Sequence, residues 1–503
     1  MELPTLDTLN LAATVPIVFL TGWALLLLVV DLFIPASRKH WSGWLAILGL
    51  VAAGVGLVLQ TANVLGPELP AEAFFGMAVV DGFAVYAQII VVVAAIFGIL
   101  LALEYLPKRR LSRGEYYTLL LFSTIGMMLM AMASDLILIF VALELLSIPL
   151  YILTGFDRYR TTSEEGAMKY FLLGAFSSAF LVYGVALTYG GTGTTALTGV
   201  LAALGGDAPS LPLAIAGVGL VVVGLGFKVA AVPFHMWTPD VYEGAPTPVT
   251  AFMSVGSKVG GFAALMRVLI AALPDLSGQW GVVIAIIAIL TMIVGNFLAI
   301  SQRNIKRMLA YSSIAHAGYI LVAVAAAQVP EAAPMAVSAA IFYMLTYAFT
   351  NLGAFGVVIA VENEEEPDSA GVGPEIEDFA GLGRTRPLLG AMMTLFMLSL
   401  TGMPISAGLV GKFFVFQAAV QASSASGWML AAAIVGVITS VISAFYYLRV
   451  PMAMYMYEGE GRAYLQPALG VALIVTALGT LLLGVIPTPL FELAQQALLT
   501  LAG

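Results

Sequence analysis

Runs of about twenty apolar residues recur along almost the whole chain, separated by short polar connections. Runs of this length let an α-helix cross the hydrocarbon core of a bilayer, where a helix satisfies its own backbone hydrogen bonds. Of the 503 residues, 61% are hydrophobic and only 10% are charged, so no soluble domain is expected. The sequence therefore predicts an all-α polytopic membrane protein.

The hydropathy pattern predicts about fourteen transmembrane segments. They lie near residues 14–34, 43–62, 81–103, 116–133, 136–155, 167–189, 211–232, 248–271, 281–300, 307–327, 334–361, 387–420, 428–449 and 467–487. The first is expected to be a retained span and not a signal peptide, because Glu2 and Asp7 precede it without any basic residue.

Sixteen of the twenty lysines and arginines lie in or beside alternate connections, each after an odd-numbered span. They are Arg38, Lys39, Lys108, Arg109, Arg110, Arg113, Arg158, Arg160, Lys169, Arg303, Lys306, Arg307, Arg384, Arg386, Arg449 and Arg462. The positive-inside rule places these connections in the cytoplasm and both chain termini outside. One missed or added span would destroy this alternation, so it also supports the count of fourteen.

One cytoplasmic connection, from Glu362 to Arg386, is strongly acidic. Blocks of like charge are usually solvated and flexible, and we expect this for the whole connection, including Glu362. A docking site for another protein is the alternative.

Six ionisable residues are expected inside the hydrocarbon region of the membrane. They are Glu144, Lys228, Lys258, Arg267, His316 and Lys412. Such residues are rare in membranes, where they usually mark ion pathways, and the simpler alternative for each is a charge held by a fixed neighbour. For Arg267, near the outer end of its helix, we favour a static role with the side chain reaching the interface.

Two spans that carry lysines contain helix-breaking residues. Lys228 is followed by four prolines between residues 233 and 248, which we expect to stop the helix. Gly402, Pro404 and Gly408 precede Lys412 in an apolar segment too long for one straight span. Discontinuous helices of this kind form sites near the middle of the membrane.

Pairing the two broken spans superposes spans four to eight on spans nine to thirteen. A unit of five helices, repeated in tandem, is inverted the second time it inserts. Lys228 then corresponds to Lys412 and Glu144 to His316, whereas Lys258 has no charged counterpart. The predicted organisation is an N-terminal three-helix segment (1–115), two inverted repeats (116–271 and 272–450) and a C-terminal helix and tail (451–503).

Four stretches carry a resemblance to a known family. They read WTPDVYEGAPTPVTAFMSVGSKVGGFAALMR, RMLAYSSIAHAGYILV, FYMLTYAFTNLGAFGVV and SLTGMPISAGLVGKFFVF. They resemble the N-subunit type of the antiporter-like membrane subunits of bacterial NADH:quinone oxidoreductase (respiratory complex I), which are related to Mrp-type cation/proton antiporters. The lysine in SVGSKVGG distinguishes the N type, since the L type typically has histidine there. The L type's long lateral helix is also expected to be absent.

The resemblance implies proton translocation by Glu144, Lys228, Lys258 and Lys412, and it implies a bacterial inner (cell) membrane with the termini on the periplasmic side. It implies NADH, FMN, iron–sulfur clusters and quinone in partner subunits. The partners implied are other membrane and peripheral subunits of complex I, including related antiporter-like subunits. No cofactor is expected in this chain, which has no cysteine to hold an iron–sulfur cluster.

The buried residues suggest a proton route from Lys228 through Lys258 and His316 to Lys412. Burial favours the neutral form of a lysine and a nearby carboxylate favours the charged form, so Glu144 is expected to switch Lys228. Two alternatives stay open: an Mrp-type Na⁺/H⁺ antiporter subunit, and a structural subunit with static charge pairs. The excess of buried lysine over buried carboxylate argues against the second.

Overall fold

A computed structural model describes residues 9–62, 64–362, 374–497 and 499–501. Among these residues, twelve helices are long and apolar enough to cross a membrane. Two further predicted spans are the shorter α2 and the broken pair α16 and α17. The prediction of about fourteen membrane-crossing segments is therefore confirmed.

The first two helices of the described residues form a hairpin, which packs on the longer helix that follows it. The helices are α2 (Val15–Asp31), α3 (His40–Thr61) and α4 (Gly82–Lys108). Between α3 and α4, β1 (Ala71–Ala73) and β2 (Ala78–Val80) form a small antiparallel ribbon in which Ala71 pairs with Val80.

The first repeat contains five crossings, of which the fourth is broken. Its main helices are α5 (Glu115–Met132), α6 (Leu136–Thr154), α7 (Thr161–Thr192), the pair α9 (Leu211–Lys228) and α10 (Thr238–Gly244), and α11 (Thr247–Met266). The short helices α8 (Leu197–Ala202) and η2 (Ala203–Asp207) lie between α7 and α9, and η3 (Arg267–Ala271) continues α11.

The second repeat follows the same plan. Its helices are α12 (Ser277–Ile300), α13 (Ile305–Ala326), α14 (Ala333–Glu362), the pair α16 (Pro387–Thr401) and α17 (Ala407–Ala422), and α18 (Gly427–Met456). The packing also repeats: α5 contacts α6 and α11, and the equivalent α12 contacts α13 and α18. Five crossings per unit invert the second copy relative to the first.

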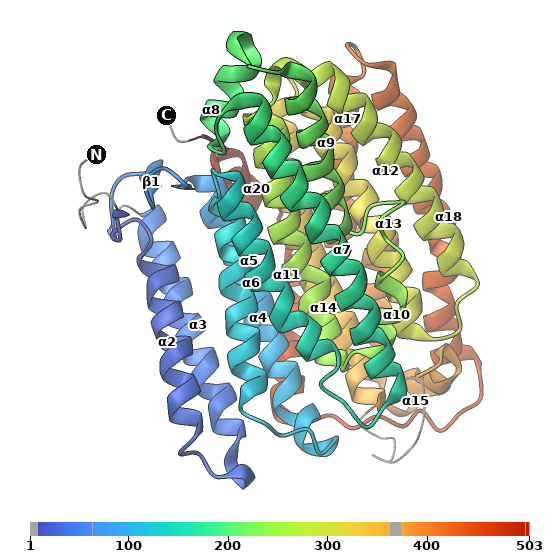
Figure 1. Cartoon of the computed structure of the whole chain (residues 1–503). Coiled ribbons are helices and arrows are strands. Elements are labelled where there is room, and N and C mark those ends of the chain that lie inside the picture. Colours follow the sequence, from blue (N-terminus) through green and yellow to red (C-terminus); the bar gives the residue numbers. More distant parts are fainter. Residues whose placement is uncertain (1–8, 63, 363–373, 498, 502–503) are drawn as a thin grey trace.

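Short connecting helices and a C-terminal pair complete the chain. They are η1 (Ala36–Arg38), η4 (Pro274–Leu276), η5 (Ile376–Phe379), α15 (Leu382–Thr385), α19 (Pro467–Val485) and α20 (Thr488–Gln496). The N and C marks lie at the same end of the bundle as β1 and α8, whereas α15 lies at the opposite end (Figure 1). The connections predicted to be cytoplasmic therefore share one end with α15.

The middle of the bundle is formed by α11, α13 and α14. Every residue of α11 is buried, as are nearly all residues of the other two. By contrast, α7 and α18 expose many large apolar side chains, as a lipid-facing helix does. The deepest helices are thus the ones that carry Lys258 and His316.

Glu362 does not belong to a solvated loop, and that part of the prediction is wrong. It is the last residue of α14 and is 0% exposed, with Oε2 accepting a hydrogen bond from Thr247 Oγ1 at 2.6 Å. The rest of the acidic connection from 363 to 373 lies outside the described residues. Beyond it, Glu375 and Asp378 form a capping box on η5 and are exposed.

Arg267 does not reach the membrane interface, contrary to the prediction. Its guanidinium is 0% exposed and forms two hydrogen bonds with the Asp81 carboxylate, at 3.0 and 3.1 Å. Asp81 also accepts a hydrogen bond from Ala84 N at 2.7 Å, which caps the start of α4. This planar two-point pairing holds α11 against α4, as a static role requires.

Replacing Asp81 by asparagine should leave the Arg267 charge buried without a charged partner. Breaking a buried pair in this way typically costs about 3–5 kcal/mol. We expect a clear fall in the melting temperature of the purified assembly. Glu460→Gln is the control, since its pair with Arg462 is exposed and such pairs contribute about 0–1 kcal/mol. Equal melting temperatures for the two variants would contradict a stabilising role for this pair.

Candidate functional site

Lys228 is the last residue of α9, and its ammonium lies among hydroxyl groups. The side chain is 2% exposed, and Nζ donates to Ser147 Oγ at 2.8 Å and to the Tyr170 hydroxyl at 3.1 Å. Nζ also lies 5.3 Å from the centre of the Tyr170 ring, which stacks on Trp237. Two neutral oxygen acceptors and an aromatic face therefore surround the charge.

The helix that carries Lys228 ends before the first proline. Ala230 has a positive φ of 61°, which directs the chain away from the helix axis. The freed Phe227 carbonyl accepts a hydrogen bond from Trp237 Nε1 at 3.0 Å. Pro239 and Pro248 instead lie in the first turns of α10 and α11, where proline fits. The predicted break is present, but those two prolines begin helices and do not end α9.

Glu144 is partly buried on α6 and does not touch Lys228 directly. Its Oε1 accepts a hydrogen bond from Ser178 Oγ on α7, and no ion pair joins it to Lys228 within the described residues. Ser147, whose Oγ accepts the hydrogen bond from Lys228 Nζ, lies three residues further along α6 on the same helix face. Glu144 and Ser147, the acceptor of Lys228, therefore lie on one face of α6, and together with Ser178 they form the Glu144 cluster.

Lys258, in the middle of α11, binds backbone carbonyl groups. It is 3% exposed, and Nζ donates to Ser313 O on α13 at 2.6 Å and to Val229 O at 3.5 Å. Val229 directly follows Lys228 at the break. The backbone at the break therefore links the two lysines, because the residue that follows Lys228 supplies a carbonyl acceptor to Lys258.

His316 lies in the centre of α13 among tyrosines. Its Nδ1 is hydrogen bonded to the Tyr343 hydroxyl at 2.6 Å, and its Nε2 to the Tyr447 hydroxyl at 3.0 Å. The Tyr347 ring lies 5.0 Å from the imidazole, and its hydroxyl donates to Ser313 Oγ at 2.9 Å. Ser313 thus contacts both Lys258, through its carbonyl, and the tyrosines around His316.

Lys412, on α17, reaches back to the end of α16. Nζ donates to the carbonyls of Leu400 and Thr401, at 3.0 and 2.9 Å, and to Ser440 Oγ at 2.7 Å. These carbonyls end a helix, where the macrodipole favours a cation. Gly402 makes the turn with a φ of 91°, and a Cβ at this position would come 3.1 Å from Cδ of the Lys412 side chain.

The structure brings four of the five predicted proton-transfer residues into one buried line: Lys228, Lys258, His316 and Lys412. Glu144, the fifth, lies in the cluster beside Lys228. Tyr319 lies between the last two members: its ring centre is 5.7 Å from the His316 ring and 4.7 Å from Lys412 Nζ. The line runs from the Glu144 cluster through Lys228, Lys258 and His316 to Lys412. Arg267 lies outside it.

The tyrosines and serines of this line were not predicted. They are Ser147, Tyr170, Ser313, Tyr319, Tyr343, Tyr347, Ser440 and Tyr447. One signal could have found two of them, because Tyr343 and Tyr347 are four residues apart in a strongly apolar helix and so share a face. Within the described residues, no group of three or more histidine, aspartate or glutamate side chains could hold a metal ion.

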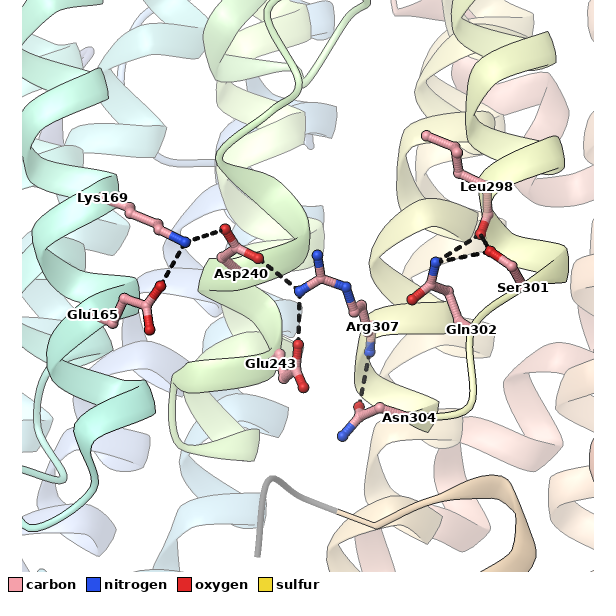
Figure 2. A network of polar contacts seen from close by, with 9 residues as sticks. All are labelled: Glu165, Lys169, Asp240, Glu243, Leu298, Ser301, Gln302, Asn304 and Arg307. Atoms are coloured by element: carbon pink, nitrogen blue, oxygen red, sulfur yellow. Dashed lines mark hydrogen bonds and ion pairs between the residues drawn. The ribbon is translucent and has the colours of Figure 1, made fainter.

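A second polar network, also not predicted, holds the short helix α10. Lys169 on α7 and Arg307 on α13 point at Asp240 from opposite sides (Figure 2). The contacts are 2.6 Å each, and Arg307 also pairs with Glu243 at 2.8 Å. Asp240 therefore joins three helices at the second half of the broken span.

Comparison with known proteins identifies similar chains over nearly the full length. The family described as "NADH:quinone oxidoreductase/Mrp antiporter, TM" matches residues 133–443. A protein named NADH-quinone oxidoreductase subunit N, from Trichlorobacter lovleyi, is 46% identical over 98% of this chain and 97% of its own length. A protein of the same name from Chloroflexus aggregans is 46% identical with complete coverage of both chains.

Chains in solved structures are also similar to this chain over nearly its full length. A chain of respiratory complex I from Thermus thermophilus with bound aureothin matches with a TM-score of 0.77 and 34% identity, covering 97% of this chain and 100% of that one. A chain of the Mrp complex from Dietzia matches with a TM-score of 0.81, covering 98% and 97%. At 22% identity, the Mrp likeness shows a shared fold alone.

Asp240→Asn should loosen α10, because the amide retains the shape but neither cation keeps its charged partner. We expect faster hydrogen exchange at the backbone amides of 238–244. Glu165→Gln is the matched control, because Glu165 is exposed and its one ion pair within the described residues is with Lys169, an i,i+4 contact of about 0.3–0.5 kcal/mol. If exchange in α10 is unchanged by Asp240→Asn, the network does not hold this helix.

Proposed function

The chain belongs to the family of membrane subunits shared by NADH:quinone oxidoreductase and Mrp antiporters, and from this membership we propose that it is the proton-translocating N-type subunit of a bacterial NADH (or other donor):quinone oxidoreductase. The observation that carries this proposal is the buried line of lysine, histidine and hydroxyl groups between the two broken helices. The relatives named subunit N support it. The first test is the subunit composition of the assembly purified from native membranes.

In the proposed mechanism each lysine alternates between ammonium and amine. Lys228 gives up a proton from Nζ, and the free amine of Lys258 takes it. The His316 imidazole and its tyrosine partners, together with bound water, pass a proton toward Lys412, which exchanges with one side of the membrane. Hydroxyl and carbonyl acceptors suit this cycle, because they stabilise an ammonium without neutralising it.

The energy for this transfer comes from partner subunits. Moving one charge against 100 mV costs about 2.3 kcal/mol, and the sequence contains neither a nucleotide-binding loop nor any cysteine to ligate an iron–sulfur cluster. We assign NADH oxidation, FMN, the iron–sulfur clusters and quinone reduction to those partners. The chain itself performs no redox chemistry in this proposal and acts as the translocating part of the enzyme.

The relatives are membrane subunits of a bacterial respiratory complex, in agreement with an inner (cell) membrane location for this chain. We propose further that the end of the bundle with α15 and the basic connections faces the cytoplasm, so both termini face the periplasm. The division at residues 115, 271 and 450 is likewise proposed.

An Mrp-type Na⁺/H⁺ antiporter subunit is the second candidate, and it rests on the shared fold. Flavin and iron–sulfur subunits that co-purify with the chain would favour the quinone oxidoreductase. Their absence from an intact native assembly, together with sodium-dependent proton exchange, would favour the antiporter.

Lys412→Met should block pumping while the complex still assembles, because it removes the ionisable group of the second broken helix. Lys412→Arg should be nearly as harmful, since a guanidinium with a pKa above about 12 retains its proton. We expect proton pumping per electron in vesicles to fall about tenfold or more in both variants. Lys169→Arg is the control and should pump normally. Normal pumping by Lys412→Arg would identify a structural charge.

Glu144→Gln should preserve assembly and reduce pumping, because the amide fills the same space without the negative charge that favours ammonium at Lys228. Proton pumping by the reconstituted complex is the measurement. Glu115→Gln, an exposed carboxylate in the first turn of α5, is the control. The role assigned to Glu144 fails if the two variants pump alike.

A further inference from the structure

A polar stripe runs along α11 from its first turn to Lys258. Its members are Thr247, Thr250, Ser254 and Lys258, at spacings of three, four and four residues, which place them on one helix face. All four side chains are buried in the middle of the bundle. Eleven residues of helix span about 16 Å, roughly half of the hydrocarbon thickness of about 30 Å.

The stripe meets a matching set of polar groups on α14. Thr247 Oγ1 donates to Glu362 Oε2 at 2.6 Å, and Asn351 Nδ2 donates to Ser254 Oγ at 2.6 Å. Asn351 and Glu362 are also eleven residues apart, about three helical turns, so they share the face of α14 that packs on α11. Two helices therefore present aligned polar side chains to each other.

Two acceptors on this face are buried without a partner. Within the described part of the chain, neither Glu362 Oε1 nor Asn351 Oδ1 accepts a hydrogen bond. A buried carboxylate or amide oxygen left in this state costs about 1–3 kcal/mol or more, and a bridging water removes the cost where several polar groups converge. The pair of side chains thus offers the groups that a short chain of water molecules needs.

The Thr247 end of the stripe lies at the basic end of the bundle. Glu362 is the last residue of α14, and its backbone carbonyl accepts a hydrogen bond from Arg109 Nη2, just after the end of α4, at 2.7 Å. Lys306, at the start of α13, is also buried here and donates to Ala245 O at 2.7 Å. The stripe therefore connects this end of the protein with the middle of the proton line.

We propose that Glu362 is a proton-uptake group of the chain, and that protons pass from it along the Thr247–Ser254 stripe to Lys258, as a second input to this lysine beside Lys228. This rests on the proposed function. The O–H bond of the Glu362 carboxylic acid breaks, water and the hydroxyls of Thr247 and Ser254 relay the proton, and an N–H bond forms at the neutral Lys258 amine. A hydronium ion in the water at the basic end then returns a proton to the Glu362 carboxylate and becomes water, so charge and atoms balance.

The test compares Glu362→Gln, Thr247→Val, Thr247→Ser and Lys258→Met in the assembled complex. We expect Glu362→Gln and Thr247→Val to lower the rate of proton pumping about tenfold, with assembly unchanged on a native gel. Thr247→Ser, which retains the hydroxyl, should pump normally. Glu104→Gln is the matched control, since Glu104 is a carboxylate at the same end that caps α19 through Ala468 N and Leu469 N.

The outcomes separate this proposal from the function on which it rests. If Lys258→Met stops pumping while Glu362→Gln and Thr247→Val pump normally, uptake through Glu362 is wrong and the proton line stands. If none of the variants changes pumping, the proposed function itself fails. If Glu362→Gln does not assemble, the pair Thr247→Val and Thr247→Ser decides: equal pumping by both overturns the proposal, and loss in the valine variant alone supports it.

Discussion

The desolvation of lysine ammonium groups governs the interior of this protein. A lysine at the centre of a membrane helix costs about 2.5–3.5 kcal/mol on insertion scales, so each one must find partners inside the bundle. The three lysines of the proton line find neutral oxygens: hydroxyls at Lys228, backbone carbonyls at Lys258, and both kinds at Lys412. Within the described residues none of them forms an ion pair. Arg267 differs, because it is fixed by a two-point contact with Asp81.

The broken helices supply part of this solvation. A continuous helix uses its carbonyls internally, whereas a helix end leaves the last four free and directs a negative partial charge at whatever lies beyond it. At the first break, Val229 O accepts from Lys258, and at the second, the carbonyls of Leu400 and Thr401 accept from Lys412. Backbone irregularity at membrane depth is thus tied to the buried amines that it stabilises.

The sequence predicted the helices and the ionisable residues for one reason: charges and polar breaks stand out against apolar runs. It did not predict the hydroxyl groups, because serine and tyrosine are unremarkable in membrane helices and their partners come from distant helices. Ser147 and Lys228 are 81 residues apart, and Asp81 and Arg267 are 186 residues apart. Glu362 was placed in a loop because an acidic block follows it, and only the packing of α14 against α11 shows its burial.

Whether the hydrogen-bond partners of a buried lysine are neutral or charged decides whether that lysine can both hold and release a proton. A carboxylate in direct contact with a buried lysine would stabilise only the ammonium, and removing the proton would leave an uncompensated negative charge. Hydroxyls and carbonyls remain tolerable when the amine is neutral, since a hydroxyl can donate to the amine instead of accepting from it. Because Lys228 and Lys258 share the Val229 junction, charge on one also disfavours charge on the other. A charged Lys228 therefore favours the neutral amine at Lys258 that accepts its proton, so like-charge repulsion alone makes neighbouring steps interdependent.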